Sequence, residues 1–218
     1  MIKEIVIAAY DRDLSWLDKI NSDVKKTIYR KGPNKKSKYD EILIEPNLGR
    51  DVHTFFNHIC LNYNNMSDYT FFAQDYPFDH FDSLIDVING DMNKLDELSL
   101  YNMNGYWGFW TRPRYCTYFS RQYNNGHNRC RMDNGSGYPD HPNLPVDKLW
   151  DGLFNEPKPN LYEFVPGGHI ILNKEKHKIR SLDFYKKICE ILITDPESPW
   201  IIERYELSIF NEKLKTKL

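Results

Sequence analysis

The segment TFFAQDYPFDHF, residues 70–81, passes within a few positions from an apolar run to aspartates, a proline and a histidine. A short, continuous apolar run is typical of a strand buried on both faces of a parallel sheet. The segment EIVIAAY, residues 4–10, has the same character and leads directly into Asp11, Arg12 and Asp13. We therefore expect two central strands, each with acidic residues at its carboxyl end.

Strand-like and helix-like segments alternate through the first 90 residues. TIYRKG (27–32) and EILIEP (41–46) have the character of further strands. Residues 52–63 carry apolar side chains at i, i+3, i+4, i+7, i+8 and i+11, which is the spacing of an amphipathic helix. Two more helices with apolar faces are expected at 182–193 and 198–210. The alternation predicts one α/β domain with a central, mostly parallel mixed sheet flanked by helices.

The composition argues against two classes of protein. The 218 residues carry a formal net charge of −2, whereas nucleic-acid-binding domains are usually basic. No apolar run reaches the roughly 20 residues that a membrane helix needs, and no secretory leader is recognised. We therefore expect a cytoplasmic protein without membrane insertion. The four cysteines form no CxxC pair, and Cys60 and Cys189, on apolar helical faces, are expected to be free core thiols.

Acidic residues at strand ends are candidates for chemistry, because ligands of open α/β sheets bind outside the carboxyl ends of the strands. Asp75 could hold a divalent cation that bridges two phosphates. Asp79 could instead cap a helix that begins near His80. Tyr10 could stack on a nucleobase while Asp11 bonds to it, although this segment could equally be an ordinary strand-to-helix loop.

Three later motifs give weaker signals. NLGRD, residues 47–51, precedes the strongest helix, so backbone amides and Arg50 could bind an anion, or the motif could simply cap the helix. His169 follows two glycines and could ligate a metal or lie in a hairpin turn. Glu203 could act as a general base on an acceptor hydroxyl, or it could lie on a charged, exposed helix face.

The order of these motifs is similar to that of a family of glycosyltransferase-like proteins long described only as a domain of unknown function. The motifs are, in chain order, AAYDRDLSWL, IYRKG, PNLGRDVHTFFNHI, FFAQDYPFDH, LDFYKKI and PWIIERYELSIF. The chain also resembles the N-terminal glycosyltransferase domain of a chlorella-virus protein that decorates the major capsid protein. The resemblance implies a single GT-A-like domain over residues 1–218, with a nucleotide-binding half (1–100) and an acceptor and sugar half (101–218).

The resemblance implies an enzyme that moves a sugar from a nucleoside diphosphate, commonly UDP, to a hydroxyl of a glycan or glycoprotein, assisted by Mn²⁺ or Mg²⁺. The family usually holds its metal with an Asp-X-Asp motif. Here Gln74 stands where the first acid would fall, and Asp75 matches the second. His169 then becomes the candidate for a further metal ligand.

By position, the resemblance also implies which residues contact the substrates. Those expected at the nucleotide are Ala9, Tyr10, Asp11, Tyr29, Lys31, Arg50 and Gln74. Glu203, in the PW…ER segment, would face the acceptor or the reacting sugar, and Glu203 and Asp75 are the expected catalytic residues.

Residues 101–160 motivate a competing hypothesis. This region is rich in Tyr and Trp, which form the flat walls of sugar sites, and it contains a long loop without clear periodicity. A carbohydrate-binding protein without catalysis is therefore the alternative. A metal-dependent phosphate-ester hydrolase ranks last, since no His-X-His pair supplies a compact metal cluster.

Overall fold

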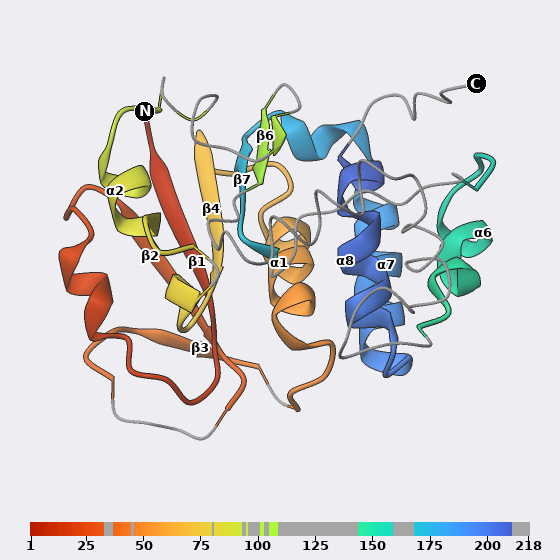
Figure 1. Ribbon diagram of the computed structural model, residues 1–218, viewed down its shortest axis with the longest axis horizontal. Coiled ribbons are helices and arrows are strands. Elements are labelled where there is room, and N and C mark those ends of the chain that lie inside the picture. The colour runs from red at the N-terminus through yellow and green to blue at the C-terminus, as the bar shows by residue number, and fades with distance from the viewer. Residues whose placement is uncertain are drawn as a thin grey trace.

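A seven-stranded sheet forms the centre of the computed structural model, in the strand order β3-β2-β1-β4-β7-β6-β5 (Figure 1). The structure describes residues 1–32, 37–44, 46–79, 81–92, 95, 101–102, 105–108, 144–158 and 168–210. The strands are β1 (Lys3–Ala9), β2 (Lys25–Arg30), β3 (Glu41–Leu43), β4 (Tyr69–Gln74), β5 (Tyr101–Asn102), β6 (Tyr106–Gly108) and β7 (Ile170–Asn173). Strands from both halves of the chain thus join one sheet.

The sheet is parallel in its first half and antiparallel in its second. β1 pairs in parallel with β2 and β4, and β2 pairs in parallel with β3. β7 then runs antiparallel to β4, and the pairs β6–β7 and β5–β6 are antiparallel as well. The predicted α/β class with a mixed sheet is confirmed, and β1 and β4, the strands predicted from continuous apolar runs, pair in parallel at its centre.

Helices cover both faces of this sheet. On one face lie the 3-10 helix η1 (Ser15–Lys19) and α2 (Leu84–Asn89), against a core that includes Ile5 and Ile7. The other face carries α1 (Arg50–Leu61), against a core that includes Val6. Successive residues of β1 therefore enter opposite cores, as the two-residue period of a strand requires.

The helix α1 lies between the sheet and a further layer of helices, α7 (Leu182–Thr194) and α8 (Ser198–Ile209) (Figure 1). Phe55 of α1 packs on Phe72 of β4, and Phe56 stacks near Tyr185 of α7. The apolar positions seen in the sequence thus serve two contacts, because Phe55 faces the sheet and Phe56 faces α7. The remaining short helices are η2 (Pro77–Asp79), η4 (Val146–Leu149), α6 (Trp150–Leu153) and η6 (Lys176–Ile179).

The turn after β4 differs from the expectation. Asp79 does not cap a helix, because it ends η2, and α2 begins only at Leu84, after Ser83. His80 lies outside the described residues. Among the described residues, no helix combines the length and the apolar character needed to cross a membrane.

Two buried glutamates show opposite ways of placing a carboxyl group in the core. Glu4 accepts hydrogen bonds from the hydroxyls of Ser67 and Thr27, both at 2.6 Å, and Lys25 lies at 2.9 Å. Although burial opposes them, these contacts lower the pKa of Glu4. Glu206 of α8 is also about 1% exposed, yet its Oε2 has no hydrogen-bond partner among the described residues.

The environment of Glu206 disfavours its charged form. Burial raises the pKa of Glu206 well above its ordinary value, and the nearby carboxylates of Glu203 and Asp51 raise it further. Arg204 compensates little, because its Nη1 is 2.5 Å from Glu203 Oε2 and donates to the Trp200 carbonyl at 2.8 Å. The folded protein therefore holds a proton on Glu206 at pH values where the unfolded chain has released it.

This difference in proton binding predicts a pH-dependent loss of stability. The folded-state pKa of Glu206 is raised. The contribution of protonated Glu206 to the free energy of unfolding is therefore complete below about pH 4.5, and it is lost as the pH rises toward the folded-state pKa. Glu206→Gln keeps the shape and cannot ionise. We expect the variant to lose less stability than the parent protein between pH 5 and pH 8, measured by urea unfolding.

A matched control is Glu190→Gln, which alters an exposed glutamate on α7. Its stability curve should run parallel to that of the parent. Parallel curves for Glu206→Gln as well would show that Glu206 is ionised in the folded protein across this range.

Candidate functional site

The carboxyl ends of β1 and β4 lie side by side, and the direction in which successive strands are added to the sheet reverses between these two strands. From β1 the chain continues to β2 on one side, whereas β4 lies on the other side of β1. Ligands of open α/β sheets bind at such switch points. A pocket of about 400 Å³ opens there. It is lined by Ala8, Ala9, Tyr10, Asp11, Lys31, Asn47, Arg50, Asp51, Gln74 and Asp75.

Asp75 fixes the loop that follows β1. Its Oδ2 accepts three backbone N–H groups, from Tyr10 at 2.9 Å, Asp11 at 3.1 Å and Arg12 at 3.0 Å. The Asp75 carbonyl also accepts from Trp16 Nε1 at 2.8 Å. One carboxylate oxygen thus gathers three converging amides, which are strong charge-assisted contacts. The acid predicted for chemistry also has a structural role, because it shapes one wall of the pocket.

The segment at Tyr10 is held from two other directions. Arg30 Nη1 donates to the Tyr10 carbonyl at 2.9 Å. Gly32 packs so closely that an added Cβ would lie 2.2 Å from the Tyr10 carbonyl oxygen, which only glycine avoids. The Tyr10 side chain itself is 49% exposed. A fixed backbone therefore presents a tyrosine ring that remains free to stack on a planar ligand.

Lys31 fixes the opposite wall. Its Nζ donates to the carbonyls of Leu48 at 2.6 Å and Arg50 at 2.7 Å, and it lies 3.1 Å from His53 Nδ1. Burial lowers the pKa of Lys31 to about 8, although the carboxylate of Asp51 partly offsets that effect. The three ammonium donors are thus directed at the protein. Lys31 lines the pocket as expected, but its main contacts hold the turn before α1.

That turn has an unusual backbone. Gly49 and Arg50 both have positive φ, 67° and 52°. A Cβ at Gly49 would lie 2.8 Å from the Leu192 carbonyl oxygen, so glycine is required there on two grounds. The consequence is that α1 starts abruptly at the pocket, where its unpaired N–H groups and the positive end of its dipole favour an anion.

Arg50 is the exposed cation at this helix start. Its guanidinium carbon lies 5.3 Å from the ring centre of Trp200, at the beginning of α8. No ion pair joins Arg50 to another described residue. Trp200 had no sequence signal that linked it to this site, because the contact joins residues 150 positions apart through the fold. The predicted anion-binding role of Arg50 fits this placement.

Gln74 occupies the place of the first acid in the expected metal motif. Its Nε2 donates to Asp51 Oδ2 at 2.5 Å, which ties the end of β4 to the start of α1. An aspartate at position 74 would bring a second carboxylate toward Asp51 and repel it. The amide instead supplies a neutral donor, so the departure from the acidic motif has a local electrostatic reason.

Three of the predicted site residues do not line this pocket. Tyr29 is 2% exposed and its hydroxyl lies 3.0 Å from His58 Nδ1, so it belongs to the core under α1 and does not face this pocket, where the resemblance had placed it. His169 is 1% exposed at the start of β7, and Gly167 lies outside the described residues. Glu203 is 9% exposed and paired with Arg204, so it does not lie on an exposed helix face.

The pocket side chains alone do not form a complete site for a divalent cation. They fit a cation that takes most of its ligands from water and from the phosphates of a substrate. Within the part of the chain that the structure describes, no group of three His, Cys, Asp or Glu residues could hold a metal ion. Asp75 has one oxygen committed to the loop amides, while its Oδ1 accepts no hydrogen bond from the described residues. Mg²⁺ commonly binds through one or two carboxylates, waters and substrate phosphates, and Asp75 meets that requirement.

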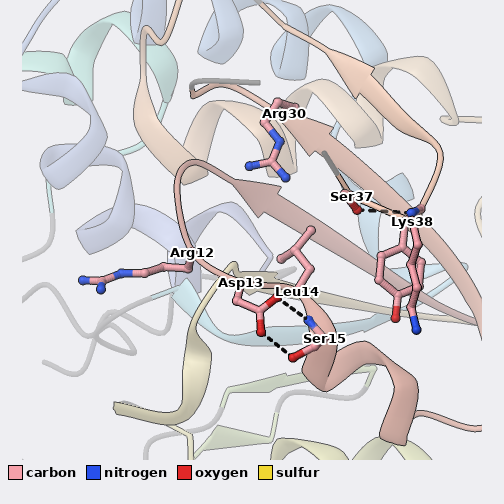
Figure 2. Close-up of a pocket in the computed structure, with 8 residues that line it drawn as sticks. Arg12, Asp13, Leu14, Ser15, Arg30, Ser37 and Lys38 are labelled. Atoms are coloured by element: carbon pink, nitrogen blue, oxygen red, sulfur yellow. Dashed lines mark hydrogen bonds between the residues drawn. The ribbon is translucent and has the colours of Figure 1, made fainter. Parts of the chain in front are cut away.

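The same loop borders a second cavity at residues 12–15, with a volume of about 360 Å³ (Figure 2). Its polar groups are largely bonded to the protein. Asp13 accepts hydrogen bonds from the Ser15 amide and hydroxyl, and Lys38 donates to Asp18 at 2.5 Å. Arg12 extends away from the other labelled side chains in Figure 2. The pocket between β1, β4 and α1 is therefore the better candidate for an anionic ligand.

The described aromatic residues of the 101–160 region do not form a platform for a sugar. Most of residues 101–160 lies outside the described ranges. Tyr106, Trp107 and Trp150 are described, and each is at most 8% exposed. These rings fill the core, so they do not offer a flat surface to a glycan.

Comparison with known proteins places this architecture in a family. No curated protein and no solved structure matches the chain. A family model does match: its description is "Protein of unknown function (DUF3431)", and it covers residues 5–215. Since the match spans nearly the whole chain, the chain belongs to the DUF3431 family.

Proposed function

We propose that this chain is a glycosyltransferase that moves a sugar from a nucleoside diphosphate, UDP in the first instance, to a hydroxyl of a glycan or glycoprotein. The observation that carries the proposal is the pocket at the switch point of the sheet. It combines an exposed tyrosine, a helix start with an exposed arginine, and a carboxylate. These are groups suited to a base, a diphosphate and a divalent cation, respectively. The motif order described above supports the same reading.

The proposed donor spans the pocket from one wall to the other. Its base stacks on Tyr10, with Ala9 and Asp11 beside it, and its diphosphate lies over the start of α1 against Arg50. Lys31 acts behind this wall by holding the turn. The volume of about 400 Å³ is within the range of small-molecule sites.

The proposed transfer needs a base near the acceptor if it inverts the sugar. The acceptor oxygen bonds to the anomeric carbon, the bond from that carbon to the diphosphate oxygen breaks, and the acceptor proton passes to a carboxylate. Glu203 is our candidate, since it lies one helical turn from Trp200, which contacts Arg50. A divalent cation, Mn²⁺ or Mg²⁺, held by Asp75 would neutralise charge on the departing diphosphate. His169 is not assigned to that cation.

The proposed compartment is the cytoplasm. Cys60 and Cys189 are free thiols, the state that reducing compartments maintain.

Titration with UDP, GDP and CMP, each with and without Mn²⁺, tests the proposal. Binding of UDP that strengthens with Mn²⁺ is the expected result. If no nucleotide binds and a glycan does, the chain is instead a carbohydrate-binding protein, and the pocket is not a donor site.

Asp75→Asn separates the two roles of Asp75. The amide oxygen can still accept the three loop N–H groups, whereas the Nδ2 group that replaces the second oxygen cannot ligate a cation. We expect the variant to remain folded and to lose the Mn²⁺-dependent gain in UDP affinity in calorimetric titration. Asp75→Ala should also lower the melting temperature, because the loop amides lose their acceptor.

Asp86→Asn, an exposed aspartate on α2, is the matched control and should leave both properties unchanged. Full Mn²⁺ dependence in Asp75→Asn would exclude Asp75 as a metal ligand.

Arg50→Ala tests the diphosphate position. Loss of a charge-assisted contact costs about 1.5–3 kcal/mol, so UDP affinity should fall roughly 10- to 150-fold. UMP affinity should change less if Arg50 holds the terminal phosphate. Arginine and alanine are equally disfavoured at a φ of 52°, so the turn itself should persist.

Lys187→Ala removes an exposed cation from α7 and should leave UDP affinity unchanged. Equal losses of UMP and UDP affinity in Arg50→Ala would place Arg50 at the nucleoside or the first phosphate.

Glu203→Gln tests the base. A general base contributes about 10²–10⁴-fold, so sugar transfer, followed as UDP release from UDP-sugars, should slow by that factor while UDP affinity stays constant. An unchanged rate would favour a retaining reaction that needs no such base.

A further inference from the structure

Two cysteines from distant parts of the chain touch between α1 and α7. The Sγ atoms of Cys60 and Cys189 lie 3.9 Å apart, although the residues are 129 positions apart in sequence. Cys60 is in the last turn of α1, and Cys189 is in α7. Both side chains are half-buried, so they are less enclosed than the free core thiols that the sequence predicted, and small reagents can reach them.

One of the two helices that carry these thiols lines the pocket, and the other packs against its start. The start of α1 lines the pocket through Arg50 and Asp51. The last turn of α7 packs on the same start, because Leu192 lies against Gly49. A covalent link between α1 and α7 would therefore tie the helix that lines the pocket to the helix that packs against its start.

We propose that Cys60 and Cys189 form a reversible dithiol site, which peroxides or small disulfides oxidise to an intramolecular disulfide that locks α1 to α7. The sulfurs must approach from 3.9 Å to about 2.05 Å, which side-chain rotation with a small helix shift can supply. Cytosolic disulfides are usually transient or redox-sensing, and a half-buried contact pair fits that class. This inference does not depend on the proposed transferase activity.

The two thiols are not equivalent. Contact with the Cys189 thiol lowers the pKa of Cys60, and the positive charge of Lys186 lowers it further. The same contact, together with burial, raises the pKa of Cys189. Cys60 is therefore the thiolate that attacks, and Cys189 is the thiol that resolves the intermediate.

With hydrogen peroxide the chemistry proceeds in two steps. The Cys60 sulfur bonds to one peroxide oxygen, the O–O bond breaks, and the departing hydroxide leaves as water after taking up a proton, which gives a sulfenic acid. The Cys189 sulfur then bonds to the Cys60 sulfur, the S–O bond breaks, and the hydroxide leaves as water with the Cys189 proton. The two cysteines lose two electrons in total and one peroxide is reduced to two waters.

The test uses the full chain with Cys116→Ser and Cys130→Ser, so that only the pair in question remains. After treatment with hydrogen peroxide, digestion without reductant and mass spectrometry should recover one linked peptide pair that contains positions 60 and 189, lighter by two hydrogens. The melting temperature should rise by about 5–10 °C, since closure of so long a loop restricts the unfolded chain. Dithiothreitol should reverse both changes.

Adding Cys60→Ser or Cys189→Ser to that background supplies the matched controls, which should fold when reduced and show no peroxide-induced rise in melting temperature. The proposal is overturned if peroxide leaves both thiols open to alkylation, or if it yields only sulfinic acid at Cys60. It is also overturned if the linked protein melts no higher than the reduced protein. UDP binding by the reduced protein, measured in parallel, reports on the proposed function separately.

Discussion

The carboxylate of Asp75 beneath the amides of residues 10–12 is the contact on which the site depends. Backbone N–H groups that follow the end of a strand have no partner in the sheet. Here three of them, after β1, converge on one carboxylate oxygen of Asp75, the residue that follows β4. The bond network joins β1 to β4 beyond the last pair of the sheet ladder. It therefore determines where Tyr10 sits and how wide the switch-point pocket opens.

Lys31 performs the complementary task on the far side of the pocket. Its ammonium group donates to the carbonyls of Leu48 and Arg50, which flank Gly49 in the left-handed turn before α1. Two ionisable residues, one of each sign, thus stabilise two loops by bonding to the backbone. What remains for a ligand is the set of groups that these loops present, chiefly an aromatic ring, a guanidinium and a helix start.

The sequence was sufficient for some of this architecture, and the reasons are local. Continuous apolar runs predicted β1 and β4, and 3.6-residue spacing predicted α1, because each pattern reflects burial of that segment alone. Tyr29 could not be assigned in the same way, since the pleat of β2 decides whether its side chain enters the core or the pocket. The contact of Arg50 with Trp200 depends on packing between distant helices, which no local pattern encodes.

The use of Asp75 and Lys31 as backbone anchors has a consequence for how such a family diversifies. Because the pocket's shape rests on side-chain bonds to main-chain atoms, it is insensitive to the identity of most loop side chains. The exposed side chains of Tyr10, Asp11 and Arg50 can then be exchanged without disturbing the scaffold that displays them. Ligand preference can then change through a few surface substitutions, while the anchors stay constrained by folding itself.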